Sequence, residues 1–289
     1  MKRYFAFFRL VELNSTFYRY PRLETVKGWR GKAPESFEFT VKVHQDISHK
    51  AKMRLDEVCL AAFNRVKEIC NVLGAKVLLF QTPASFRPDR LGDAENFFRA
   101  VKRDGLVFVW ETRGFGWETF EAQKRLGDVL AGVGVSHVTD PFRVLPVYVG
   151  EVAYFRLHGL GERMYYYQYS DLELRRLFDL VKPYDERGKS VYVFFNNLAM
   201  FDDARRFAEF LERGRFPRLN VGVGVDSVKE VLAGTRFPVS KSALIKRFGW
   251  RLFEVKEGEQ VRLGTFLSCL PQKGFKSLDD VLKEIKAKI

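Results

Sequence analysis

A chain of 289 residues with 46% hydrophobic and 29% charged side chains can bury a large core and is too apolar to be intrinsically disordered. Its formal net charge of +13 attracts polyanions without specifying one. The three cysteines lack metal-site or disulfide spacing, which argues against a disulfide framework. Charged residues interrupt the first apolar run, which argues against a signal peptide and a membrane span there. We therefore expect a cytoplasmic protein that does not enter a membrane.

Short apolar segments with strand character alternate with segments of helical periodicity along the chain. Repeated strand–helix units imply parallel strands joined by right-handed crossovers. Eight such strands favour an α/β fold of the (βα)8 TIM-barrel-like type, and an open doubly wound sheet is the alternative. The expected strands are residues 11–15, 37–44, 76–83, 107–113, 135–140, 153–159, 191–197 and 219–226, and the expected helices are residues 56–73, 91–101, 118–130, 170–181 and 202–213.

The C-terminal part of the chain has a different pattern. Residues 240–248 and 278–285 have helical periodicity, and residues 250–255 and 260–267 predict a strand pair joined by a short turn. This part is also rich in lysine and arginine. We therefore predict a barrel domain at residues 1–235 and a small basic α+β module at residues 236–289, whose role the sequence does not specify.

Polar residues share one face near the ends of four expected strands. Side chains at positions i and i+2 of a strand point to the same side. Burying such groups without partners costs on the order of several kcal/mol each, so a set of them at strand ends indicates a functional site. The residues concerned are Glu12 and Asn14, then Thr40, Lys42 and His44, then Glu111 and Arg113, and finally Arg156 and His158.

Four of these residues are the predicted catalytic groups. Glu12 and Glu111 form a carboxylate pair that can divide acid and base roles. Lys42 is expected to bind an anion, and an imine-forming (Schiff-base) role is the less favoured alternative. His158 beside Gly159 is the predicted general acid or base. The alternative for the charged residues is a set of structural ion pairs, Glu12 with Lys42 and Glu111 with Arg113.

Further polar and aromatic residues are predicted to bind the substrate. Arginines match oxyanions with their planar fork, and aromatic rings stack on bases or sugars. A divalent metal on Glu12, Glu111, Asp140, His158 and Asp226 is an alternative that no local spacing supports and that the nearby cations oppose, so the sequence requires no cofactor. The predicted substrate-binding residues are Asn14, Tyr18, His49, Gln81, Arg113, Trp117, Asp140, Arg156, Tyr169 and Asn196.

Several motifs occur in an order that resembles the YecE-like family, known as domain of unknown function 72. They are VELNSTFYRYP, FEFTVKVHQDISH, LLFQTPASF, WETRGFGW, YFRLHG with YYYQYS, and VYVFFNN, and they extend from about Leu10 to Leu211. The resemblance implies a TIM-barrel-like fold with its signature polar residues around the mouth. It also implies that His49 occupies the family's Thr/Ser-His position. It implies little about the reaction.

The chain departs from the family pattern at its beginning. The family usually opens with a strand carrying a Gly-Thr-Ser-Gly-Trp type motif, whereas this chain has MKRYFAFF there. We hypothesise that residues 219–225 occupy the missing strand's slot, as in a circular permutation. A misplaced start codon is the competing explanation. Pairing of residues 220–225 with residues 11–14 is the observation that decides between them.

These observations predict an enzyme, a hydrolase or lyase acting on an anionic substrate at the C-terminal mouth of the barrel. The favoured reaction is cleavage of a phosphoester, with nucleic acid as one candidate substrate. One alternative is a glycoside-acting enzyme that uses Glu12 and Glu111. Another is a non-catalytic nucleic-acid-binding protein that uses its basic C-terminal module. The expected partner is an anionic small molecule or nucleic acid, and protein partners and oligomeric state are not specified.

Overall fold

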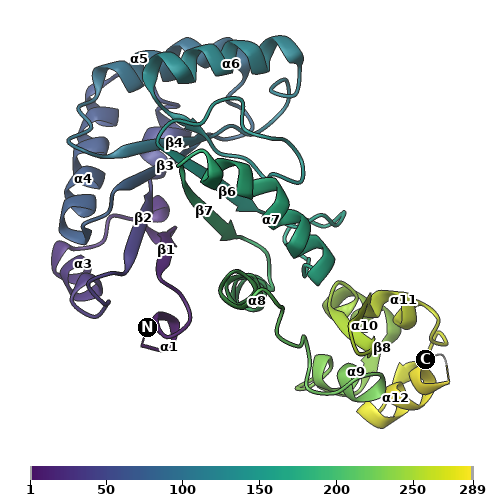
Figure 1. The fold of residues 1–289 in the computed structure, drawn as a ribbon. Coiled ribbons are helices and arrows are strands. Elements are labelled where there is room, and N and C mark those ends of the chain that lie inside the picture. The colour runs from purple at the N-terminus through teal and green to yellow at the C-terminus, as the bar shows by residue number, and fades with distance from the viewer. Residues whose placement is uncertain (1, 288–289) are drawn as a thin grey trace. The chain divides into compact units, whose positions relative to one another are not determined.

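The computed structural model describes residues 2–287, and the chain divides into two compact units (Figure 1). Of the described residues, the first unit contains residues 2–156 and 181–194, and the second contains residues 157–180 and 195–287. Within residues 2–287, no helix has both the length and the apolar composition needed to cross a membrane.

A parallel sheet forms the centre of the first unit. Five strands pair in chain order, and a bridge between Thr139 and Phe155 continues this order to the next strand. The prediction of parallel strands is therefore confirmed. The five strands are β1 (Leu10–Leu13), β2 (Glu38–Lys42), β3 (Val77–Gln81), β4 (Val107–Glu111) and β5 (Ser136–His137), and a second sheet pairs β6 (Val152–Leu157) with β7 (Ser190–Phe195).

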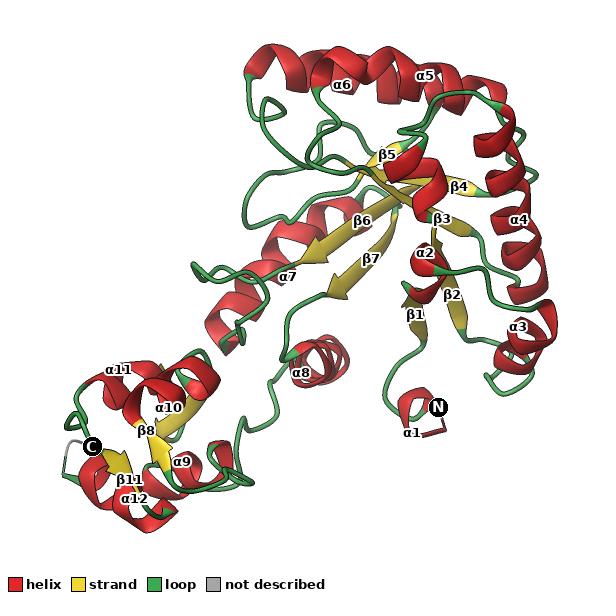
Figure 2. Ribbon diagram, turned by 180° about the vertical axis from the view of Figure 1, so that it is seen from behind, coloured by secondary structure: helices red, strands yellow, loops and turns green. Residues whose placement is uncertain are grey.

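Helices connect these strands, and Figure 2 shows α4, α5 and α6 along one side of the sheet. The helix α4 begins where the Asp56 side chain accepts a hydrogen bond from the Cys59 amide, and ends at Gly74 with φ 67°. Only glycine adopts this left-handed conformation without strain. The helices and turns of this unit are α1 (Lys2–Phe5), α2 (Ser15–Tyr18), α3 (Leu23–Arg30), η1 (Asp46–Lys50), α4 (Glu57–Leu73), η2 (Pro88–Arg90), α5 (Leu91–Ala100) and α6 (Phe120–Val133).

The two faces of the sheet bury different residues. The face toward the helices carries a phenylalanine-rich core that includes Phe63, Phe80 and Phe108. The opposite face carries a smaller apolar cluster formed by Val77, Leu79, Val109, Val138, Val152 and Tyr154. On the strands β3, β4 and β6, the residue two positions after the last member of this apolar cluster is polar and points to the same side. These polar residues are Gln81, Glu111 and Arg156. The predicted alternation of faces is confirmed.

The eighth expected strand is absent. Residues 219–224 form turns and bends, and the helix α9 begins at Val225. The Glu230 carboxylate accepts hydrogen bonds from the amides of Val221 and Gly222, and Gly224 has φ 58°, which an extended strand does not allow. The amides are therefore committed to local partners. Because β1 pairs only with β2 among the described strands, the circular-permutation hypothesis is wrong, and the strand pairings of residues 2–287 do not show a closed barrel.

The second unit contains the C-terminal part of the chain. Its helices and its antiparallel strand pairs agree with the predicted α+β character. The C-terminal helices and strands pack around one apolar cluster. This cluster includes Val228, Val231 and Leu232, which precede the predicted domain boundary at residue 236. The elements are α8 (Met200–Arg213), α9 (Val225–Val231), α10 (Lys241–Phe248), α11 (Leu263–Ser268) and α12 (Leu278–Lys286), with the pairs β8 (Val239–Ser240) and β11 (Gly274–Phe275), and β9 (Leu252–Lys256) and β10 (Glu259–Arg262).

The helix α7 (Asp171–Glu186) spans the boundary between the units. A capping box begins this helix, because the Glu173 carboxylate accepts from the Ser170 amide and the Ser170 hydroxyl accepts from the Glu173 amide. The helix continues past the predicted end at residue 181 and contains Pro183.

Candidate functional site

A buried arginine joins the two predicted catalytic carboxylates. Arg156, 3% exposed, donates from Nη2 to Glu12 Oε1 at 2.7 Å and from Nε to Glu12 Oε2 at 3.0 Å. Its Nη1 donates to Glu111 Oε2 and, at 3.2 Å, to Gln81 Oε1. Residues from strands β1, β3, β4 and β6 therefore meet at one point. The convergence follows from parallel strands, whose C-terminal ends lie at one edge.

Glu12 accepts hydrogen bonds from three different side chains of this cluster. Besides Arg156, its carboxylate accepts from the Tyr154 hydroxyl at 2.7 Å and from Asn14 Nδ2 at 2.9 Å. The Tyr154 hydroxyl also lies 2.9 Å from Thr40 Oγ1. Burial, and then the charge of Glu12, raise the pKa of Tyr154. Four donor atoms therefore surround the Glu12 carboxylate.

The electrostatics of Arg156 explain why this network is tolerated. Burial acts to lower the pKa of Arg156, but the charges of Glu12 and Glu111 outweigh that effect and raise it overall. Arg156 therefore remains charged. A guanidinium that binds two carboxylates satisfies buried charges that would otherwise be very costly.

Lys42 is the buried cation that this network does not neutralise. Its side chain is 8% exposed and ends β2, and Nζ donates to Gln81 Oε1 at 2.8 Å. Nζ also lies 4.1 Å from the centre of the Phe17 ring. Among residues 2–287 it has no ion-pair partner. The alternative pairing of Glu12 with Lys42 is therefore wrong, because Arg156 occupies Glu12, whereas the pairing of Glu111 Oε1 with Arg113 Nε is present at 2.7 Å.

Its surroundings change the acidity of this lysine. Burial, and then the charge of Arg156, lower the pKa of Lys42 from 10.5 to about 8, although Glu111 and Glu12 act in the opposite direction. An uncompensated buried lysine with such a pKa is typical of a functional residue.

Phe17 and His49 complete the surroundings of Lys42. Thr16 is fully buried and donates from its hydroxyl to the Lys42 carbonyl at 2.8 Å, which fixes α2 and its neighbour Phe17 beside the end of β2. The rings of Phe17 and His49 meet edge to face at 4.7 Å. Burial, and then Lys42 and Arg113, lower the pKa of His49 to about 4, so its imidazole is neutral at pH 7.

Five charged groups of the first unit make up this cluster. They are two carboxylates, Glu12 and Glu111, and three cations, so cations exceed carboxylates by 3 − 2 = 1 among these five groups. Among residues 2–287 no group of three or more His, Cys, Asp or Glu side chains is arranged to hold a metal ion. The three cations are Lys42, Arg113 and Arg156.

The described contacts of three other predicted residues of the first unit are with residues other than Glu12, Lys42 and Arg156. Tyr18 is 71% exposed and contacts Phe17 edge to face. Trp117 is buried in the core on the helix side, where its indole donates to the Phe86 carbonyl. Asp140 accepts from the Phe142 amide in a turn after β5. The structure gives Trp117 and Asp140 local structural contacts, and their binding of substrate stays a prediction.

Three predicted residues belong to the second unit. The His158 ring meets Tyr165 at 5.8 Å. Tyr169 is fully buried, and its hydroxyl accepts from the Gly159 amide, which gives it a packing role. The Asn196 amide donates to the Leu157 carbonyl. The catalytic role of His158 and the binding roles of Tyr169 and Asn196 therefore stay predictions.

Sequence reasoning missed or undervalued two residues. Phe17 lies next to Tyr18 in the sequence, and no periodicity distinguishes the two aromatic residues. Tyr154 shares the inner face with Arg156 at period two, which was a usable signal, but its hydrogen bond to Glu12 depends on a strand 142 residues away.

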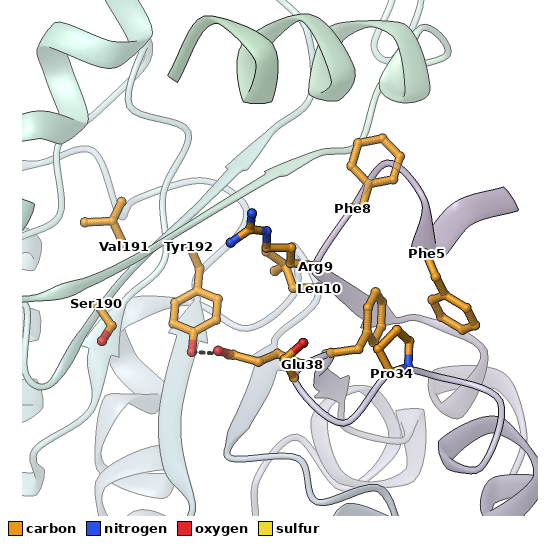
Figure 3. A pocket seen from close by; sticks show the side chains of 11 residues that line it. Phe5, Phe8, Arg9, Leu10, Pro34, Glu38, Ser190, Val191 and Tyr192 are labelled. Carbon is orange, nitrogen blue, oxygen red and sulfur yellow. Dashed lines mark hydrogen bonds between the residues drawn. The ribbon is translucent and has the colours of Figure 1, made fainter. Parts of the chain in front are cut away.

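A separate hollow of about 580 Å³ opens at the N-terminal ends of β1, β2 and β7 (Figure 3). Aromatic side chains line much of it, and Tyr192 donates to the Glu38 carboxylate at 2.8 Å. This hollow is at the opposite strand ends from Lys42. It is therefore distinct from the charged cluster.

Parallel strands with helices between them, and a polar cluster at the C-terminal strand ends, define an α/β protein with a parallel sheet. Residues 1–220 match the family described as Protein of unknown function DUF72, and the chain belongs to that family. The resemblance inferred from the motifs is confirmed.

Individual relatives agree with this assignment. The chain is 33% identical over 92 residues to the UPF0759 protein YecE of Escherichia coli K12, a stretch that spans 32% of this chain and a third of that protein. A DUF72 family protein of Thermotoga maritima is 27% identical, with a TM-score of 0.59 over 73% of this chain and 88% of that one. A DUF72 family protein of Enterococcus faecalis is 22% identical, with a TM-score of 0.57 over 73% and 91%, and shows likeness of fold alone.

Proposed function

We propose that this chain is an enzyme that binds a small anionic substrate beside Lys42 and Arg113. The observation that carries the proposal is a buried lysine without an ion-pair partner in residues 2–287, in a cluster with one surplus positive charge. Such an arrangement lowers stability and is retained where a ligand supplies the missing charge. An anion bound there would neutralise the cluster.

The reaction proposed is that of a hydrolase or lyase, and a phosphoester is the favoured substrate. Arg113 is partly exposed, with 26% of its side chain accessible, so its guanidinium can reach a bound oxyanion. The proton-transfer role passes to Glu111 in this proposal, because Glu12 is enclosed by four donors and acts as a positioning residue.

The TIM-barrel-like ring is part of the same proposal. Side chains of the last two strands bond to those of the first two: Tyr154 to Glu12, and Tyr192 to Glu38. The inner apolar cluster also combines β3, β4 and β6. These contacts support a curved sheet whose first and last strands face each other across the inner cluster.

Two alternatives from the sequence are less well supported. Arg156 lies between Glu12 and Glu111 and binds both, so it occupies the space in which a glycosidic bond would sit between two carboxyls. For nucleic acid, the support is a set of exposed cations in the second unit that form no ion pairs with residues 2–287: Lys246, Arg247, Lys276, Lys283 and Lys286.

Calorimetric titration with inorganic phosphate tests the proposal. At pH 7 the wild-type chain should bind phosphate, and Arg113→Gln and Lys42→Met should each weaken binding about tenfold or more, because each removes a charge beside the anion. Lys246→Met is the matched control, since it removes an exposed charge of the second unit. Equal affinities in all four proteins would contradict an anion site at Lys42.

A further inference from the structure

We propose that Lys42 is also a covalent attachment point, which forms an imine with the carbonyl group of an anionic aldehyde or ketone. This inference rests on the proposed anion site and specifies its substrate class. Arg113 would hold the carboxylate or phosphate of the substrate, and Lys42 Nζ would attack its carbonyl carbon. Imine formation by Lys42, which the sequence favours less than anion binding alone, is thus the role proposed for its amine.

The contacts of Lys42 leave its nitrogen available for chemistry. Its only hydrogen-bond acceptor in residues 2–287 is the neutral Gln81 Oε1, at 2.8 Å. A carboxylate partner would fix the proton on Nζ and suppress attack, whereas an amide accepts one N–H without neutralising the charge. The carboxylates that could pair with it are bound to Arg156 instead.

The identity of the residue supports an amine over a simple positive charge. Wherever this cluster pairs a carboxylate, it uses arginine: Arg156 with Glu12 and Glu111, and Arg113 with Glu111. The guanidinium does not lose its proton in proteins and cannot act as a nucleophile. Lysine stands at the one buried cationic position without a carboxylate partner among residues 2–287, and lysine is the cation that can form an imine.

The acidity of Lys42 is consistent with this role. A pKa of about 8 leaves about 10% of the amine neutral at pH 7, against about 0.03% for a lysine with the ordinary value of 10.5. The nucleophilic form is thus about 300 times more abundant than in an exposed lysine.

The proposed step is balanced without an oxidant or reductant. Neutral Nζ forms a bond to the carbonyl carbon, and the carbonyl oxygen takes up a proton to give a carbinolamine. Nitrogen loses a proton, and the hydroxyl oxygen takes up a second proton. The carbon–oxygen bond then breaks, so that the oxygen leaves as one molecule of water while the nitrogen lone pair forms the carbon–nitrogen double bond. The product is an imine, protonated to an iminium, which withdraws electrons from the adjacent carbon as a lyase reaction requires.

Reductive trapping tests this inference on the whole chain. The protein is incubated with glyoxylate, an anionic aldehyde, and sodium cyanoborohydride at pH 7.5, and labelled peptides are mapped by mass spectrometry. Lys42 should be labelled about tenfold or more faster than exposed Lys246, even though its burial opposes access. Propanal, a neutral aldehyde, and the Arg113→Gln variant should each reduce that preference. Labelling of Lys42 no faster than that of Lys246 would overturn the inference.

Phosphate titration and labelling of the wild-type chain together separate this inference from the proposed function. Lys42→Arg is the control for the labelling, because it removes the amine and labelling at position 42 should be lost. Phosphate binding without preferential labelling of wild-type Lys42 overturns the imine and leaves the anion site standing. Absence of both phosphate binding and labelling overturns both proposals.

Discussion

Replacing Lys42 by methionine should make the protein more stable. Lys42 is 8% exposed and is not paired with a carboxylate among residues 2–287. Its pKa falls from 10.5 to about 8 on folding, and one pKa unit corresponds to about 1.4 kcal/mol, so the charged side chain costs roughly 3 kcal/mol at pH 7. Methionine is unbranched, has a similar length and fills irregular apolar space well.

The stabilisation should depend on pH with a defined sign. Because the pKa of Lys42 is lowered on folding, the unfolded chain binds more protons between pH 8 and pH 10.5. The free energy of unfolding of the wild type should therefore rise across that window, and the advantage of Lys42→Met should vanish above it. Below pH 8 the advantage should be complete, at about 2–3 kcal/mol.

Urea unfolding at pH 7 and pH 11 measures this difference directly. The control is Lys246→Met, which should change the free energy of unfolding by less than about 0.5 kcal/mol because Lys246 is exposed. If Lys42→Met lowers the free energy of unfolding by 1 kcal/mol or more, the reasoning that Lys42 is held at a cost to stability is refuted.

Three further outcomes follow from the same contacts. Glu12→Gln should destabilise the protein by about 3–5 kcal/mol in urea unfolding, because it leaves the buried Arg156 without its bidentate partner; a change below about 1 kcal/mol would contradict the positioning role of Glu12. Phosphate affinity, corrected for the ionisation of phosphate itself, should decline as pH rises through about 8, because Lys42 then loses its proton. A corrected affinity that stays level to pH 10 would contradict a contribution of Lys42 to binding. Gln81→Glu should keep the acceptor for Lys42 and Arg156, yet weaken phosphate binding, because it adds a negative charge beside the anion; unchanged binding would place the anion elsewhere.

Local patterns in the sequence were sufficient to predict much of the fold. The helix at residues 56–73 has an apolar stripe, an Asp cap and a C-terminal glycine, and the structure contains all three. The inner face of β4 was predicted in the same way, because Val107, Val109 and Glu111 repeat at period two. Such signals lie within a few residues of one another, so single segments contain them.

The false strand at residues 219–225 shows where local patterns mislead. Alternating valine and glycine mimic a strand, but the conformation is set by Gly224 and by contacts with Glu230 and Glu254. Those partners lie 8 to 30 residues away along the chain from the amides that they bind. Alternation alone does not distinguish a strand from a loop whose amides are bound by side chains.

The sequence was sufficient to predict which residues form the site, but not which cation pairs with which carboxylate. Period two placed Glu12, Lys42 and Arg156 on inward faces, but it does not specify which cation lies closest to which carboxylate. Arg156 binds Glu12 because its fork reaches from β6 to β1, a relation set by strand order and register. That choice leaves Lys42 unneutralised, and it determines the chemistry proposed for the site.

The most direct test of this account is a site-resolved titration of the Lys42 side chain by NMR, with Lys246 as the exposed reference. The account predicts a midpoint near pH 8 for Lys42, and an upward shift of that midpoint when phosphate is added. A midpoint near 10.5 that phosphate does not change would contradict it.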